Sequence, residues 1–325
     1  MISLGLFAIE PETGLPPHRT SQRNLLLILS LGTVLTIACT AMAGQPPGNV
    51  QSFPAGHSPE GLAFDGNSIW AVNGPDSAVT KLRASDGSIE GVFPVGREPH
   101  YLVFDGTNIW VANAEDGTVT KLRASDGTFL ATYHAGVNPF GITFDGANIW
   151  VTNPLSNLVT KLRASDGVIQ GSFAVGHFPR LITFDGANIW VANEWSNTVT
   201  KLRASDGALL GTFPAGPSPF APRVRGGNLW VTNLDAGTVT RLRTSDGTLL
   251  GSFDSGPTPT AIAFDRTSLW VTNLILEGQV TRLRIKDLNR SKTYPVELFP
   301  IDVIFDGTSI WVSNLLSDTV TRIQP

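Results

Sequence analysis

Apolar residues in this chain fall in short runs separated by turn residues, and the runs return in the same order about every forty residues. In most repeats an apolar run ends in Phe-Asp-Gly, then Ile-Trp-Val and Val-Thr-Lys-Leu-Arg follow, and Ser-Asp-Gly leads into a further apolar run. Seven tryptophans mark the period, forty residues apart except for a last step of forty-one: Trp70, Trp110, Trp150, Trp190, Trp230, Trp270 and Trp311. Four short strand-like runs per period of about forty residues are typical of β-propeller blades.

The second repeat illustrates the expected strands. They span residues 101–104, 108–112, 119–123 and 129–133. Each is short and rich in β-branched or aromatic residues, as strands are. Asp105-Gly106 and Asp126-Gly127 lie between them and predict tight turns, because Gly adopts positive φ and Asp bonds its own backbone. We therefore expect an all-β, seven-bladed propeller of four-stranded antiparallel blades.

The two ends of the repeat region complement each other. The last repeat stops after its third strand, at residues 321–323, whereas residues 50–56 resemble the fourth strand of other repeats, such as 211–216. We expect the N-terminal strand to complete the seventh blade, so that residues 44–325 form a single domain. Such a ring has no open seam at which an edge strand could aggregate.

Residues 1–43 have a different character. Arg19 and Arg23 precede the apolar stretch 25–38, and Ala41-Met42-Ala43 is a small-x-small sequence of the kind that signal peptidase cleaves. These features predict a signal peptide that is removed after Ala43, and a secreted, periplasmic or cell-surface location. The alternative is a lipoprotein in which Cys39 is the lipidated residue. We expect attachment to a membrane only in that case.

The cysteine content and the net charge exclude some kinds of bond and partner. Cys39 is the single cysteine, so cleavage after Ala43 would leave no thiol for disulfides. The formal net charge of −4 is spread evenly over the repeats. Nucleic-acid binding would require a concentrated basic face, so we expect no nucleic-acid partner. We expect a monomer.

The repeated phrase resembles the repeats of the YVTN-type β-propeller family, with Trp in place of Tyr. The resemblance is carried by Trp150-Val151-Thr152-Asn153, Trp230-Val231-Thr232-Asn233 and Trp270-Val271-Thr272-Asn273. It implies a propeller of the kind found in extracytoplasmic and surface-layer proteins. It implies no activity, because a fold by itself does not specify one.

Residues that recur in every repeat are explained by what every blade needs. The repeated tryptophans are expected to pack against the next blade, and the repeated aspartates to form turns. Lys81, Arg83 and their equivalents in the third strands are expected in solvent, or with only their charged ends there.

Function is expected where the repeats differ. Loops that join strand four to strand one, and strand two to strand three, emerge on the same rim of a propeller. The residue after the Pro that opens each first strand should therefore surround one opening; it is Glu60, His100, Phe140, Arg180, Phe220, Thr260 or Ile301. Glu194 and Trp195 belong to a loop on the same rim, and Trp195 is the tryptophan outside the repeat. Rim residues also vary where nothing constrains them, which is the alternative interpretation.

A second resemblance raises the possibility of catalysis. Pro99-His100-Tyr101-Leu102 is similar to the Pro-His-Gly-Ile phrase of virginiamycin B lyase, another seven-bladed propeller. That resemblance implies chemistry dependent on magnesium near clustered His and Glu residues, with His100 as the catalytic candidate. The corresponding blade phrase of that family ends in Glu, whereas here it ends in Asn in every repeat, as at Asn113. The carboxylates that would hold the metal are therefore missing from the matching positions.

The expected function is that of a binding module acting at the central opening. The candidate ligand is a polar small molecule or a saccharide, and an envelope protein is the other candidate partner. The residues expected to bind it are Glu60, His100, Phe140, Arg180, Phe220, Glu194 and Trp195. No cofactor is expected, although a divalent metal is possible. Two alternatives stay open: a metal-assisted lyase or hydrolase at the same rim, and a structural component of the cell envelope.

Overall fold

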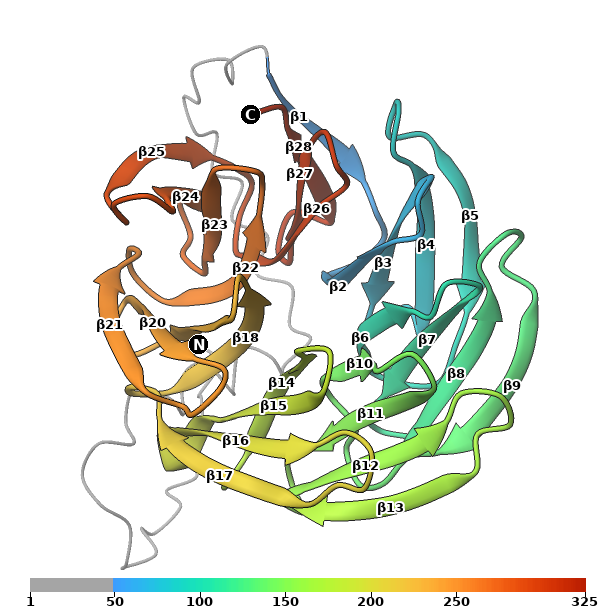
Figure 1. Ribbon diagram of the computed structural model, residues 1–325. Helices are drawn as coiled ribbons and strands as arrows, with labels where there is room; N and C mark the ends of the chain where they lie inside the picture. Colours follow the sequence, from blue (N-terminus) through green and yellow to red (C-terminus); the bar gives the residue numbers. More distant parts are fainter. Residues whose placement is uncertain (1–48) are drawn as a thin grey trace, which may run out of the picture. The chain divides into compact units, whose positions relative to one another are not determined.

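The computed structural model describes residues 49–325, which form seven four-stranded antiparallel sheets arranged as the blades of a propeller (Figure 1). The innermost strands are β2 (Pro59–Phe64), β6 (Pro99–Phe104), β10 (Ile142–Phe144), β14 (Pro179–Phe184), β18 (Pro219–Arg225), β22 (Pro259–Phe264) and β26 (Pro300–Phe305). The second strands are β3 (Ser68–Asn73), β7 (Asn108–Asn113), β11 (Asn148–Asn153), β15 (Asn188–Asn193), β19 (Asn228–Asn233), β23 (Ser268–Asn273) and β27 (Ile310–Asn314).

The third strands are β4 (Ala78–Arg83), β8 (Thr118–Arg123), β12 (Leu158–Arg163), β16 (Thr198–Arg203), β20 (Thr238–Arg243), β24 (Gln279–Arg284) and β28 (Thr319–Ile323). The outermost strands are β5 (Ile89–Pro94), β9 (Phe129–His134), β13 (Ile169–Ala174), β17 (Leu209–Pro214), β21 (Leu249–Asp254), β25 (Arg290–Pro295) and β1 (Val50–Pro54). A short 3₁₀ helix, η1 (Glu194–Ser196), lies between β15 and β16. Blade one is the sheet that contains β2, and the others follow in chain order.

Each innermost strand contacts the innermost strand of the next blade, and β26 contacts β2, so the seven blades form a closed ring (Figure 1). The prediction of seven four-stranded antiparallel blades is confirmed. In the second blade the observed strands extend the predicted ones by at most two residues at either end. The predicted turns at Asp105-Gly106 and Asp126-Gly127 are present, with positive φ at both glycines.

Strand β1 supplies the fourth strand of the seventh blade. It pairs antiparallel with β28, in a register that runs from Val50 opposite Ile323 to Pro54 opposite Thr319. Val50 is buried, and the ring of Phe53 lies 5.7 Å from that of Trp311. The two ends of the described chain thus share one sheet.

The repeated tryptophans form the core between blades, as expected. Trp70 is fully buried and packs against Ile109 and Val111 of the next blade. On its own blade it contacts Phe93, at 5.5 Å between ring centroids. Its indole N–H donates to the Asp65 carboxylate at 2.8 Å, a contact that sequence analysis missed. The aspartate of Phe-Asp-Gly therefore forms the turn and also anchors the tryptophan.

The expectation that the lysines of the third strands lie in solvent is wrong. Lys81 is 8% exposed, and its ammonium donates to the carbonyl of Ala124 in the next blade at 2.9 Å. The same ammonium lies 5.2 Å from the centre of the Trp70 ring, within the range of a cation–π interaction. Arg83, at the end of the same strand, is exposed as expected. The third-strand lysine therefore joins neighbouring blades.

The predicted signal peptide at residues 1–43, with Cys39, lies outside the described residues. Within residues 49–325 there is no helix of the length and apolar character needed to cross a membrane.

Candidate functional site

The side chains that follow the opening proline of each inner strand are more enclosed than sequence analysis predicted. Glu60, Phe140, Phe220, Thr260 and Ile301 are buried, and the side chains of His100 and Arg180 are 18% and 12% exposed. Five of the seven form a continuous series of contacts, which we call the rim cluster: Glu60, His100, Phe140, Arg180 and Phe220. Thr260 is outside this series and shares a hydrogen bond of 2.9 Å with Thr272 of its own blade.

The first part of the rim cluster is an ion pair across blades one and two. Nδ1 of His100 lies 2.8 Å from a carboxylate oxygen of Glu60. Burial lowers the pKa of His100, but the charge and hydrogen bond of Glu60, together with the charge of Glu98, raise it by more, so that the pKa lies above its ordinary value. The protonated imidazole is therefore favoured beside Glu60.

The second part is a guanidinium surrounded by aromatic rings. Arg180 lies 5.0, 4.5 and 5.4 Å from the ring centres of Phe140, Phe178 and Phe220. Its Nε donates to the carboxylate of Glu194, which is buried. The faces of aromatic rings attract cations, so these contacts and the ion pair hold the guanidinium in one place.

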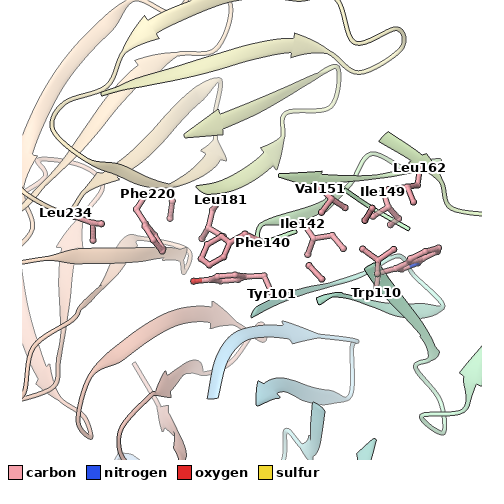
Figure 2. Packing of buried hydrophobic residues seen from close by; sticks show 14 residues of the cluster. Tyr101, Trp110, Phe140, Ile142, Ile149, Val151, Leu162, Leu181, Phe220 and Leu234 are labelled. Atoms are coloured by element: carbon pink, nitrogen blue, oxygen red, sulfur yellow. The ribbon is translucent and has the colours of Figure 1, made fainter. Parts of the chain in front are cut away.

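Phe140 joins the two ion pairs. Its ring centroid lies 4.9 Å from that of His100, while Arg180 approaches it at 5.0 Å. Figure 2 shows Phe140 beside Tyr101 and Leu181, and Phe220 in β18 on the far side of Leu181. The centroids of Phe140 and Phe220 are 6.2 Å apart and the rings meet edge to face. The structure thus brings together six of the seven predicted binding residues, with Glu194 included.

The seventh, Trp195, reaches solvent. It lies in η1 and is 48% exposed. Its ring stacks on Phe178, with centroids 4.2 Å apart and an angle of 4° between the planes. Phe178 has the left-handed φ of 55°, and its N–H donates to Asn157 at 2.9 Å. Since Arg180 lies against Phe178 as well, Trp195 is the outer member of a stack that begins in the rim cluster.

A hydroxyl in the second strand positions the rim, and sequence analysis missed it. The Thr152 hydroxyl donates to the carbonyl of Arg180 at 2.7 Å and accepts from the N–H of Gly141 at 2.8 Å. Ser313 makes the matching contact with the carbonyl of Glu60 at 2.5 Å. The sequence did carry a signal for this hydroxyl. The residue before the repeated Asn is Thr or Ser in four repeats, whereas it is Val or Ala in the first, second and fourth.

The residues around His100 do not fit a magnesium site of the lyase type. Within residues 49–325, no three His, Cys, Asp or Glu side chains converge as metal ligands. Asn113, at the position where that family has Glu, is fully buried and donates to Thr120 at 2.9 Å. An amide that holds two strands together in the interior is not a replacement for an exposed carboxylate ligand.

Comparisons with known proteins agree with the fold. A streptogramin B lyase structure is 22% identical, with a TM-score of 0.73 over 85% of this chain and 97% of that chain. A chain of hydrazine synthase from Kuenenia stuttgartiensis is 19% identical, with a TM-score of 0.70 over 89% and 99% of the two chains. The U3-55K structure is 13% identical, with a TM-score of 0.74 over 86% and 100%. No family model and no curated protein matches the sequence. At these identities the likeness establishes the propeller fold alone.

Proposed function

We propose that this protein is a binding module that contacts a saccharide or a similar polar ligand through the rim around Trp195. The observation that carries the proposal is the exposed face of Trp195 stacked on Phe178. A sugar ring has one apolar face and polar edges, and an aromatic ring with polar neighbours matches both.

The stack prepares Trp195 for binding. Phe178 packs against the inner face of the indole, and Arg180 supports Phe178 from the rim cluster. An aromatic side chain already fixed in one orientation loses little conformational entropy when a ligand binds, and this favours affinity. The backbone N–H of Trp195 donates to the carbonyl of His177 at 3.2 Å, and that of His177 to the Ser196 hydroxyl at 2.7 Å. Polar groups therefore adjoin the aromatic surface.

The enclosed residues have a supporting part in this proposal. Glu60, His100, Arg180 and Glu194 form ion pairs with one another, so they hold the rim in shape while Trp195 makes the outer contact. The proposal includes export through the leader at residues 1–43, as expected for a protein that meets extracellular saccharides. It also includes membership in the YVTN-type propeller family, which is a prediction from the repeated sequence alone.

The proposal is tested by screening soluble oligosaccharides against the purified protein by thermal shift, with and without divalent metals, and measuring the affinity of any hit by calorimetry. Trp195→Ala should weaken binding at least tenfold. Leu155→Ala is the matched control, because Leu155 is an exposed apolar residue in the equivalent loop of blade three. No thermal shift with any saccharide, or equal loss in both variants, would sink the proposal. Turnover of a hit that stops on chelation would instead favour the lyase alternative.

A further inference from the structure

The inner strands enclose a cavity whose walls do not include Trp195. Its volume is about 280 Å³, and its walls come from the third to the sixth residues of the inner segments, each counted from the proline that opens it. The apolar part of the wall includes Leu62, Phe64, Leu102, Ile142, Leu181 and Ile182. A water molecule occupies about 30 Å³ of liquid, so the cavity has room for far more than one.

Besides Thr143, three larger polar side chains line this cavity at positions where most repeats have small or apolar residues: Tyr101, Arg223 and Asp302. The third residue of the inner segment is Tyr101 or Asp302 in two repeats, and Gly61, Gly141, Leu181, Ala221 or Ala261 in the others. The fifth residue is Arg223 in one repeat, and Ala63, Val103, Thr143, Thr183, Ala263 or Ile304 in the others. The propeller scaffold therefore does not require these polar groups.

Tyr101 presents a hydroxyl that the protein leaves unsatisfied. The residue is 5% exposed, and within residues 49–325 no group forms a hydrogen bond with its oxygen. The ring packs against Phe140 with 5.2 Å between centroids, and Figure 2 shows the oxygen directed away from Trp110 of the same blade. A buried hydroxyl without a hydrogen-bond partner is destabilising, so a partner from outside the chain is expected.

Asp302 supplies a carboxylate that is held in place by the backbone. It is 1% exposed, and its two oxygens accept from the N–H groups of Leu62 at 2.8 Å and Val303 at 2.9 Å. Each carboxylate oxygen has a further lone pair. Burial raises the pKa of Asp302, and the positive charge of Arg223 opposes that rise. The carboxylate would gain from a hydrogen-bond donor or a positive charge beside it.

Arg223 supplies the opposite charge. Its Nε donates to the carbonyl of Ile262 at 3.3 Å, and in the described part of the chain this is its one hydrogen bond. The two terminal nitrogens can then act as paired donors toward a carboxylate. Arg223, Asp302 and Tyr101 all line the same cavity, so the three groups can act on one ligand.

We propose that this cavity binds a small zwitterion of the amino-acid type. Its carboxylate would accept from Arg223 and from the Tyr101 hydroxyl, its ammonium group would donate to Asp302, and its apolar side chain would lie along Leu62, Ile142 and Leu181. A simple anion would meet the Asp302 carboxylate, and a simple cation would meet Arg223. A ligand with both charges satisfies all three polar groups at once.

The test is calorimetry and thermal shift of the full protein with each of the twenty L-amino acids. For any amino acid that binds, the amine without the carboxylate and the acid without the ammonium group serve as half-ligands. Arg223→Ala and Asp302→Ala introduce the residue that other repeats have at the same positions. We expect each variant to weaken binding at least thirtyfold, Tyr101→Phe to weaken it about five- to tenfold, and both half-ligands to bind at least tenfold more weakly.

Asp302→Asn is a second variant, should Asp302→Ala fold poorly: it keeps the side-chain shape, and its single oxygen can still accept one of the two backbone hydrogen bonds. Trp195→Ala should leave amino-acid affinity unchanged, so failure of the saccharide proposal and failure of this one are distinguishable. If no amino acid binds, the cavity holds water only and the inference is wrong. It is equally wrong if binding persists in both Arg223→Ala and Asp302→Asn.

Discussion

Arg225 stands five residues before Trp230, where every other repeat has an aspartate, and the buried indole N–H of Trp230 has no hydrogen-bond partner within residues 49–325. In the six other blades this N–H donates to the aspartate at 2.7 or 2.8 Å. Arg225 instead reaches the next blade, where it donates to the carbonyls of Asp265 and Arg266. Blade five therefore provides a natural control for the contribution of the Trp–Asp hydrogen bond.

Comparison of Trp110→Phe with Trp230→Phe measures that contribution. Both variants remove the same atoms from a buried ring, but only Trp110→Phe breaks a hydrogen bond to a carboxylate, at 2.7 Å. A hydrogen bond to a charged group contributes about 1.5–3 kcal/mol, so Trp110→Phe should lower the free energy of unfolding by that much more than Trp230→Phe. Urea denaturation gives both values. Equal losses would show that the indole hydrogen bond adds nothing to stability.

Acid should destabilise the propeller through its turn aspartates. Burial raises the pKa of Asp105, but hydrogen bonds from Trp110 and the turn residues lower it by more. The pKa values of Asp185 and Asp265 are lowered for the same reasons. Hydrogen bonds from Thr128 lower the pKa of the exposed Asp126 to about 2. A carboxyl whose pKa is lower in the folded than in the unfolded state stabilises the fold above the unfolded pKa, and loses that effect as pH falls through the folded pKa.

The expected result is a melting temperature that falls progressively between about pH 4 and pH 2, because the ordinary pKa of aspartate is about 3.9. Differential scanning calorimetry across this range provides the measurement. Asp105→Asn should melt lower than the wild type at pH 7, and the difference should shrink toward pH 2. A constant difference at every pH would contradict the assignment.

The His100 and Glu60 pair should have the opposite dependence on pH. The pKa of His100 lies above its ordinary value of 6.5, so the pair stabilises the fold fully below that value and loses this effect as pH rises through the higher folded pKa. His100→Gln should therefore cost more stability at pH 5.5 than at pH 9. Glu60→Gln is the control, because without the Glu60 charge His100→Gln should no longer cost more stability at pH 5.5 than at pH 9. Chemical denaturation at several pH values distinguishes these outcomes.

Closure of the ring by β1 can be tested with one aromatic residue. Phe53 packs on Trp311 at 5.7 Å, as Phe93 packs on Trp70 at 5.5 Å within blade one. Phe53→Ala should lower the free energy of unfolding by about 2–4 kcal/mol, somewhat less than truncating a fully buried aromatic residue because Phe53 is partly buried, and Phe93→Ala by a similar amount. Deleting residues 44–56 should lower the melting temperature further, because β28 then has an unpaired edge. Unchanged melting of the deletion would contradict closure by β1.

Sequence alone was sufficient for the blades but insufficient for the contacts between them. Turn residues and short apolar runs located the four strands of the second repeat, because both signals are local. Lys81 was misplaced because β4 lies inside its sheet, where five of its six residues are buried by the strands and blades on either side. The alternation of apolar and polar residues along one strand does not show which strands and blades cover it.

The candidate site was predicted in part for a similar reason. The second position of each inner segment identified Glu60, His100 and Arg180, which do lie together. Whether they faced solvent depended on their partners, since Glu194 belongs to a different loop, 14 residues from Arg180, and pairs with it only in the folded chain. The third and fifth positions held Tyr101, Asp302 and Arg223. Comparing those positions across the repeats in the same way would have revealed the polar groups of the cavity enclosed by the inner strands.

The third-strand cations have a consequence for the chain ends. Lys81 of blade one reaches Ala124 of blade two, and Arg322 of blade seven reaches the carbonyl of Ser85 in blade one at 2.7 Å. The interface between blades seven and one is thus joined by the same kind of hydrogen bond, from a third-strand cation to a backbone carbonyl, as the interface between blades one and two. The position of the chain ends is therefore not special in the ring. A circular permutant opened at a different outer strand would retain the same hydrogen bonds between blades.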